Sequence, residues 1–337
     1  MTSDFNPTVS LIIPLFNEEE MIPLLISSIE AFRSGREENI EVIFVDDGSI
    51  DKTFELVRSQ TQGLAGYQLF QFSRNFGHQM AISAGVQSCK SDAAIVMDAD
   101  LQDPLDVAGR MIDTWKQGYD VVYGVRNSRA KVPVSQRLTA HWYYRLFTRL
   151  SDVEAPLDAG DFRLISRNVI EAFNQFTEQQ PYVRGLISWL GFKQIGIEYD
   201  RPGRVFGKTK YPFAKRFQFA MAGLTSFSSR PLKLAVNLGL LIAFGSLVGL
   251  IWVLVTKYVL GTAITGWASL IFAAFFFGGI QLLFLGIVGT YVARVYDEVK
   301  GRPRFVIREM WNSSGKPAVI GSNHGNGVLD ESKTTSI

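Results

Sequence analysis

Short runs of almost entirely apolar residues alternate with longer amphipathic stretches over roughly the first 124 residues. The apolar runs occupy residues 9–13, 41–45, 68–72, 93–97 and 121–123, and the amphipathic stretches occupy 19–32, 52–60, 79–88 and 106–117. This alternation predicts strand–helix–strand units on a mostly parallel sheet with flanking helices. Strands that are apolar along their whole length are covered on both faces. We therefore expect an α/β domain whose ligands bind beyond the carboxyl ends of its strands.

The pattern changes in the carboxyl-terminal third, where residues 234–255 and 268–292 contain no charged side chain. At about 1.5 Å per residue, each run is long enough to cross a bilayer core of about 30 Å. Two buried helices of a soluble domain are the alternative, but a run containing three consecutive phenylalanines, 275–277, is hard to surround in so small a domain. The runs predict two transmembrane helices, and their glycines suit close helix packing in lipid, which allows a homo-oligomer.

Basic residues predict how these two helices are oriented. Lysines and arginines cluster before the first run and after the second, whereas the loop between the runs contains only Lys257. By the positive-inside rule, both ends of the chain face the cytosol, at the inner membrane if the source is bacterial. The segment 211–233 includes aromatic residues together with Lys215 and Arg216, which indicates an interfacial amphipathic helix, with an ordinary soluble helix as the alternative.

These segments divide the 337-residue chain into four parts. A cytosolic α/β domain occupies 1–210, the interfacial region 211–233, a transmembrane hairpin 234–292 and a cytosolic tail 293–337, which we expect to be disordered after about residue 312. The amino terminus lacks the basic segment of a secretory signal.

Composition adds limits to this picture. The 34 Lys and Arg residues nearly balance 32 Asp and Glu residues, which gives no reason to expect nucleic-acid binding. The single cysteine, Cys89, cannot form an internal disulfide, and the three histidines are too scattered to suggest a histidine-rich metal site.

Two polar clusters follow the first two predicted strands. Pro14, Phe16 and Glu18 belong to the segment PLFNEEE, which by itself is also compatible with a plain turn and helix start. Asp46 and Asp47 end the second strand, where their carboxylates could accept hydrogen bonds from a base N–H or from ribose hydroxyls. A turn followed by a helix capped by Ser49 is the alternative for this second cluster.

A third cluster, Asp98-Ala99-Asp100, follows the strand predicted at 93–97. A turn there can direct both carboxylates at one cation, and Gln102 can add a carbonyl oxygen. Hard oxygen ligands suit Mg²⁺ or Mn²⁺, which would keep positions open for diphosphate oxygens. The alternative is a loop of solvated aspartates.

Taken together, the motifs PLFNEEE, VDDGS, SRNFGHQMA and DADLQDP resemble the inverting GT-A glycosyltransferases of family 2. The segments GDFRLISR and RVFGKTKY and the two apolar runs narrow the resemblance to polyprenyl-phosphate glycosyltransferases. That group includes dolichol-phosphate mannose synthase and, more similar to this chain, the GtrB-type undecaprenyl-phosphate glucosyltransferases. The similarity covers roughly residues 8–308, with the motifs in the family's order.

The resemblance implies roles for particular residues. It implies a nucleotide-sugar donor held by Pro14, Phe16, Glu18, Asp46 and Asp47, and a metal held by Asp98, Asp100 and Gln102. Asp161 matches an essential acidic residue near the transferred sugar, with a structural acid paired to Arg163 as the alternative. Arg126, Arg204 and Lys210 match positions that face phosphates, for which guanidinium and ammonium groups are natural partners.

The implied reaction transfers a sugar to a polyprenyl-phosphate lipid at the cytosolic membrane face, with UDP-glucose and undecaprenyl phosphate as the favoured pair. GDP-mannose and UDP-aminoarabinose are alternative donors on the same scaffold. A processive polysaccharide synthase is disfavoured because the chain has neither a Gln-x-x-Arg-Trp motif nor further spans. A non-catalytic nucleotide-sugar-binding membrane scaffold is the alternative of a different class.

Overall fold

The structure is a computed structural model that describes residues 7–126, 159–201 and 266–313, together with scattered positions between 232 and 255. The chain forms two compact units. The first contains Met1–Leu138, Val153–Tyr211 and Gly301–Ile337, and the second contains Thr139–Asp152 and Pro212–Lys300. The end of the chain therefore returns to the unit formed by its beginning.

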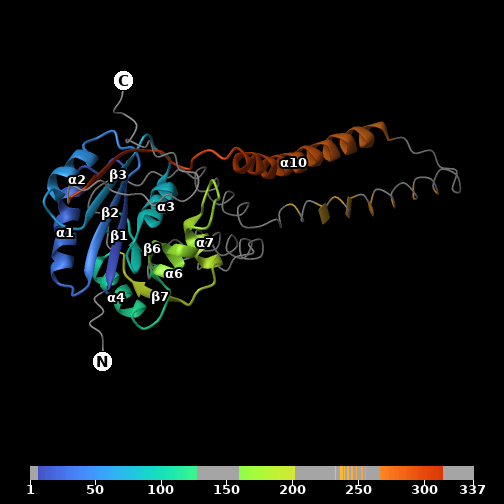
Figure 1. Ribbon diagram of the computed structural model, residues 1–337. Coiled ribbons are helices and arrows are strands. Elements are labelled where there is room, and N and C mark those ends of the chain that lie inside the picture. Colours follow the sequence, from blue (N-terminus) through green and yellow to red (C-terminus); the bar gives the residue numbers. More distant parts are fainter. Residues whose placement is uncertain are drawn as a thin grey trace, which may run out of the picture. The chain divides into compact units, whose positions relative to one another are not determined.

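The first unit is built on an eight-stranded sheet in the order β7-β5-β6-β4-β1-β2-β3-β8 (Figure 1). Its strands are β1 (Thr8–Leu15), β2 (Asn39–Asp46), β3 (Tyr67–Phe72), β4 (Ala93–Val96), β5 (Val121–Arg126), β6 (Ala159–Ser166), β7 (Gln194–Tyr199) and β8 (Ile307–Asn312). The helices of this unit are α1 (Ile22–Ser34), α2 (Thr53–Thr61), α3 (His78–Ser88), α4 (Leu105–Trp115), α6 (Arg167–Phe173) and α7 (Val183–Trp189).

The predicted α/β class is confirmed, and all five expected strands and all four expected helices are present. The sheet is mixed, however. Strands β1, β2, β3 and β4 are mutually parallel where they pair, as are β5 and β7. Strand β6 runs antiparallel to both β4 and β5, and β8 runs antiparallel to β3. The prediction of a mostly parallel sheet therefore describes the first four strands better than the two flanks.

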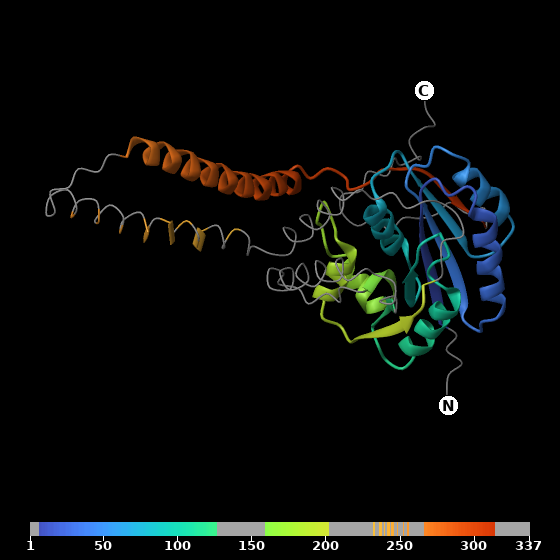
Figure 2. The same ribbon diagram turned by 180° about the vertical axis from the view of Figure 1, so that it is seen from behind.

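Helices cover both faces of the central strands, which explains why these strands are apolar throughout. Alternate residues of β1, such as Leu11 and Ile13, pack in one core with Leu25 of α1 and Phe54 of α2. On the other face, the α3 backbone approaches so closely that a Cβ atom at Gly85 would lie 2.3 Å from Ile12 Cγ2. Figure 2 shows the same two layers of helices from behind.

Strand β8 was not predicted, because the sequence analysis assigned its residues to the tail. It pairs with β3, and the preceding Phe305 is buried and stacks on Phe72 with ring centroids 5.0 Å apart. The backbone N–H of Ser73 donates to the Val306 carbonyl. The chain that follows the apolar helix is thus part of the sheet.

The second unit contains α10 (Trp267–Val299), which includes the second predicted span. Within it, Phe276–Val299 has a mean hydropathy of 1.8, and this is the one helix of the described residues that is long and apolar enough to cross a membrane. Large apolar side chains such as Leu282 and Leu285 are exposed on it. The first predicted span and the interfacial segment 211–233 lie mostly outside the described residues, and the chain after 313 lies outside them entirely.

Candidate active site

The site lies where β1, β2 and β4 end, because these three neighbouring strands are parallel and finish at the same edge of the sheet. The antiparallel strand β6 begins at this edge. Arg163 of β6 pairs with Val96 of β4, so Asp161, two residues earlier, lies across from Asp98, two residues beyond Val96. Sheet topology therefore brings together two acidic residues that are 63 positions apart in the sequence.

The loops after β1 and β2 are joined by hydrogen bonds. The backbone N–H of Asn17, a residue with φ of 54°, donates to Ser49 Oγ, and the Asn17 side chain accepts from the Ile50 N–H. The Glu18 N–H donates to Thr53 Oγ1. These hydrogen bonds hold the loops after β1 and β2 together, and we call the two joined loops the rim.

The residues expected to hold the nucleoside lie on this rim or in the strand ends that lead to it, but they differ in accessibility. Phe16 is 44% exposed, whereas Asp46 and Asp47 are buried. Asp46 accepts hydrogen bonds from Ser49 and from the Gln71 side chain. Pro14 is in β1, opposite Val45 of β2.

Asp47 joins the rim to the loop after β3. Its carboxylate accepts hydrogen bonds from the backbone N–H groups of Phe76 and Gly77, at 2.7 Å and 2.9 Å. The adjacent Gly48 has φ of 70°, and a Cβ atom there would lie 2.5 Å from the Arg74 carbonyl carbon. Asp47 thus ties the loop after β2 to the loop after β3, and Asp46 holds Ser49, whose hydroxyl accepts from Asn17 in the loop after β1.

The turn after β4 is held by Asp103. One Asp103 oxygen accepts a hydrogen bond from the Asp98 N–H at 3.2 Å, and the other accepts one from the Tyr199 hydroxyl at 3.0 Å. The same hydroxyl accepts a hydrogen bond from Arg126 Nε. Arg126, which we expected to face phosphates, is thereby connected to the Asp98 turn.

Asp98, Ala99 and Asp100 of this turn differ in their contacts and in their exposure. Asp100 accepts a hydrogen bond from the Gln102 N–H at 3.1 Å, and Ala99 is buried. The Asp98 side chain is 34% exposed, with His78 Nε2 3.7 Å from Oδ1 and Arg201 Nη2 3.7 Å from Oδ2.

Negative charge is concentrated at Asp98. Burial raises the pKa of its carboxyl to about 6, and the neighbouring carboxylates of Asp103, Asp100 and Asp161 add to this rise, against the opposing effect of His78. A pKa raised by neighbouring carboxylates marks a position where a cation would be stabilised.

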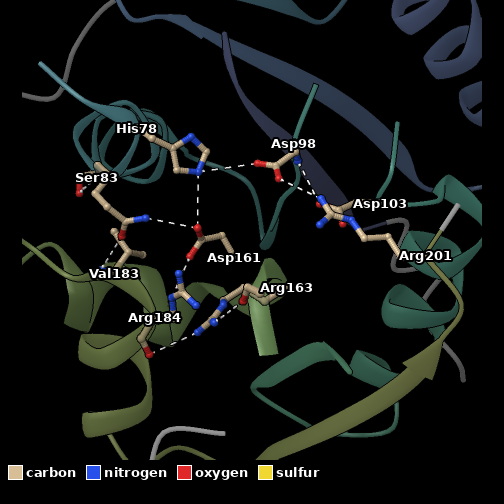
Figure 3. Close-up of polar contacts among 11 residues, drawn as sticks. His78, Ser83, Asp98, Asp103, Asp161, Arg163, Val183, Arg184 and Arg201 are labelled. Carbon is tan, nitrogen blue, oxygen red and sulfur yellow. Dashed lines mark hydrogen bonds and ion pairs between the residues drawn. The ribbon is translucent and has the colours of Figure 1, made fainter. Parts of the chain in front are cut away.

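Asp161 is surrounded by donors (Figure 3). His78 Nε2 lies 3.4 Å from Oδ2, Gln79 Nε2 donates to the same oxygen at 3.3 Å, and Arg184 Nε lies 3.4 Å from Oδ1. Burial alone would raise the Asp161 pKa, but the hydrogen bond from His78 and the charge of Arg184 outweigh it and hold the pKa below its ordinary value. Asp161 is therefore a fixed, ionised carboxylate.

The alternative role for Asp161 was a structural acid paired with Arg163, but the buried Arg163 is not such a partner. Its guanidinium donates to the backbone carbonyls of Gly160, at 2.8 Å, and Arg184. Burial lowers the pKa of Arg163 to about 10. Arg163 supports the chain around Asp161, and its charge helps to keep that carboxylate ionised.

His78 stands between the two acidic centres. Burial alone would lower its pKa, but contact with Asp161 and the charges of Asp98 and Asp161 outweigh burial and raise it. His78 was not predicted to be in the site, because the scattered histidines gave no indication of a histidine-rich metal site. The available signal was the position of His78 at the start of a helix that follows a predicted strand, where this sheet gathers its functional side chains.

A divalent cation fits the donor set of this turn. No group of three His, Cys, Asp or Glu side chains among the described residues is arranged as a complete metal site. Mg²⁺ in nucleotide-dependent enzymes needs only one or two protein carboxylates, because substrate phosphates and water supply the other oxygens. Asp98 and Asp100 meet that need, and the neighbouring carboxylates of Asp103 and Asp161 add to the negative charge that would attract a cation.

Most of the residues expected in the site lie at this edge of the sheet. The turn after β4, Asp161 and Arg126 are connected directly or through one side chain, and the residues expected to hold the nucleotide are on the neighbouring rim. Arg204 and Lys210 lie outside the described residues. His78 and Gln79 lie in the motif SRNFGHQMA, but no role was predicted for them, nor for Arg184 and Arg201.

Comparisons with known proteins agree with this geometry. The family model described as glycosyl transferase family 2 matches residues 10–173, a range that includes Asp98 and Asp161. A relative from Bacillus subtilis (strain 168), the uncharacterized glycosyltransferase YkcC, is 41% identical over 91% of this chain and 95% of its own length. The chain belongs to glycosyltransferase family 2.

Other relatives of this chain have more specific names. The prophage bactoprenol glucosyl transferase homolog of Escherichia coli (strain K12) is 35% identical over 90% of this chain and 99% of its own length. The SfII prophage-derived bactoprenol glucosyl transferase of Shigella flexneri is 35% identical over 89% of this chain and 97% of its own length. The similarity to these glycosyltransferases extends well beyond residue 173.

Proposed function

We propose that this family 2 glycosyltransferase transfers glucose from UDP-glucose to a polyprenyl phosphate, with inversion at the anomeric carbon. One observation carries the proposal: the ionised Asp161 lies beside the Asp98 turn, with His78 between them. A donor diphosphate held at Asp98 would direct its sugar toward Asp161. The names of the bactoprenol glucosyl transferases that resemble this chain over about 90% of its length support glucose and a polyprenyl phosphate as the substrates.

The donor would be held by its diphosphate at the turn after β4 and by its nucleoside near the rim. Asp98, Asp100 and Gln102 would hold Mg²⁺ or Mn²⁺, which when bound neutralises the charge that develops on the departing diphosphate. Exposed Phe16 offers an apolar surface to the base. Asp46 and Asp47, whose oxygens accept hydrogen bonds within the protein, would act mainly by fixing the rim that touches the nucleoside.

The acceptor phosphate is already ionised near neutral pH, so it needs a strong general base less than a sugar hydroxyl does. Asp161, held by the Gln79 hydrogen bond and by ion pairs with His78 and Arg184, would orient the sugar or the acceptor more than it would remove a proton. Arg184 and Arg201, each within 4 Å of one of the acidic side chains, bring positive charge to which a lipid phosphate would be attracted. Arg126, Arg204 and Lys210 remain predicted phosphate-binding residues.

Anchoring explains why such an enzyme would carry an apolar helix. A polyprenyl chain stays in the bilayer, so its phosphate is presented at the membrane surface. The exposed apolar side chains of α10 suit lipid, and the charge pattern predicts a catalytic domain on the cytosolic side. The enzyme would then act at the inner membrane without extracting its acceptor.

A donor panel tests this function. Purified full-length protein is incubated with undecaprenyl phosphate and radiolabelled UDP-glucose, GDP-mannose or UDP-aminoarabinose, with Mg²⁺, Mn²⁺ or a chelator, and lipid-soluble label is counted. We expect label from UDP-glucose only, lost with the chelator. Label from another donor would replace the glucose assignment, and nucleotide-sugar binding without transfer would favour the scaffold.

A further inference from the structure

The side chain of Gln79 bridges two parts of the site that the sequence places far apart. Gln79 lies in the first turn of α3, and its Oε1 accepts a hydrogen bond from the Val183 N–H at 3.0 Å. Its Nε2 donates to Asp161 Oδ2 at 3.3 Å. One amide group thus connects α3, the start of α7 and the acidic residue on β6.

The hydrogen-bonding partners fix which way this amide points. The Val183 backbone N–H can only donate, so the carbonyl oxygen of Gln79 must face it. The NH₂ group is therefore directed at Asp161, whose ionised carboxylate can only accept. Val183 is the first residue of α7, where a backbone N–H has no partner within the helix, and the preceding Tyr182 provides no side-chain cap.

The hydrogen bond from Val183 to Gln79 also bears on the second carboxylate oxygen of Asp161, Oδ1. Arg184, the residue after Val183, contributes the guanidinium that lies 3.4 Å from Asp161 Oδ1. Fixing the backbone at Val183 fixes where the Arg184 side chain begins. Gln79 therefore acts on one Asp161 oxygen directly and on the other through the chain.

We propose that Gln79 is a positioning residue that orients Asp161 and Arg184 for transfer, a role that rests on the proposed function of Asp161. Gln79 acts through these two side chains. Its loss would leave the Asp98 turn and the nucleotide rim in place, so donor affinity would be retained while turnover falls.

A Gln79→Glu substitution separates the two halves of the bridge. Glutamate has nearly the same shape and keeps an oxygen that accepts from the Val183 N–H, but it replaces the donor to Asp161 with a second negative charge. Gln79→Met removes both hydrogen bonds without adding a charge. Ser83→Ala is the matched control, because Ser83 lies one turn further along α3 and its hydroxyl donates only to the backbone carbonyl of Gln79.

The experiment measures kcat, the KM for UDP-glucose and the melting temperature of each full-length variant with undecaprenyl phosphate. We expect Gln79→Glu to lower kcat about 30-fold and Gln79→Met about 10-fold, with KM within about twofold and Ser83→Ala close to wild type. A kcat for Gln79→Met within twofold of wild type would overturn the proposal. So would a rise in KM that accounts for the whole loss, or an equal loss in Ser83→Ala.

A double variant tests whether Gln79 acts through Asp161. If it does, Gln79→Met adds little to the loss already caused by Asp161→Asn, whereas independent residues would give multiplied losses. Multiplied losses contradict the positioning role. Wild-type protein serves as the reference for the proposed function: if it transfers no sugar at all, that function fails, and if it transfers sugar but the Gln79 variants do so equally, only the positioning role fails.

Discussion

At the scale of single residues, the site depends on how acidic groups are held as much as on which acids are present. Asp161 and Asp98 are 63 positions apart in sequence and have opposite electrostatic environments. Donors lower the pKa of Asp161, whereas burial and other carboxylates raise that of Asp98. One site therefore contains a carboxylate suited to orienting a substrate and another suited to a cation.

Asp161→Asn tests the first of these roles. The amide keeps the size of the side chain but removes the charge that faces His78 and Arg184, so we expect turnover to fall about 100-fold or more. Donor affinity, measured by calorimetry with UDP-glucose, should stay within about twofold because the Asp98 turn is untouched. Asp106→Asn, an exposed aspartate on α4, is the control, and near-normal turnover of Asp161→Asn would exclude the assigned role.

At the scale of elements, an ion-pair cluster fastens α4 to the start of β2. Glu38, 6% exposed, accepts hydrogen bonds from Arg36 and Lys116, and Arg36 also pairs with Asp113 of α4. Burial would raise the Glu38 pKa, but the hydrogen bonds from Arg36 and Lys116 outweigh it and lower the pKa to about 2. Asp113 and Lys116 lie at the carboxyl end of α4, the helix that follows the Asp98 turn, so the cluster holds that helix to the sheet.

This lowered pKa gives a pH-dependent contribution to stability. A carboxyl whose folded-state pKa is depressed stabilises the fold above its unfolded pKa of about 4.3, and that contribution is lost as the pH falls toward 2. We expect Glu38→Gln to reduce the free energy of unfolding by about 2 kcal/mol at pH 7. The difference from wild type should shrink between pH 4.5 and pH 2 in denaturant titrations. The neighbouring exposed Glu37→Gln is the control, and a difference that does not depend on pH would contradict this explanation.

Strand β8 should also contribute to the stability of the sheet. Without it, β3 would become an open sheet edge and the buried Phe305 would lose its contact with Phe72. We expect a chain that ends after Arg304 to melt about 10 °C lower than wild type and to aggregate. A chain that ends after Ser313 keeps β8 and should melt like wild type. Equal melting temperatures for the two truncations would show that β8 adds no stability.

At the scale of the whole molecule, the chain leaves the α/β unit for an apolar segment and then returns to it. The described residues contain one helix that is long and apolar enough to cross a membrane, and the sequence predicts a second span before it. A hairpin would return the chain to the side from which it left, which agrees with β8 belonging to the same sheet as β1.

Reporter fusions test this topology. Alkaline phosphatase inserted near residue 260 should be active, because the predicted hairpin loop faces away from the cytosol, and a fluorescent protein fused to the carboxyl terminus should fluoresce. Fusion of phosphatase at the carboxyl terminus is the matched control and should be inactive. Active phosphatase at both positions would contradict a two-span hairpin.

The sequence by itself determined the strand–helix alternation and the Asp98 turn, whereas the candidate role of Asp161 came from the resemblance to family 2. These features could be predicted because apolar periodicity and turn residues are local, and because the motifs stand together at strand ends. The mixed character of the sheet was harder to predict. Strand β8 occupies a segment after the apolar helix, and strand direction depends on pairing between distant segments.

Only the tertiary structure decided what surrounds each acid. His78, Gln79 and Arg184 come from two helices and meet Asp161 on β6. Asp161 itself lies across from Asp98 because β4 and β6 run antiparallel. No local pattern encodes either relation. Likewise, Asp46 and Asp47 were predicted from their position at a strand end, but burial commits their oxygens to the neighbouring loops. Residue type fixes which chemistry a side chain can perform, whereas burial and the donors around it decide its charge and orientation.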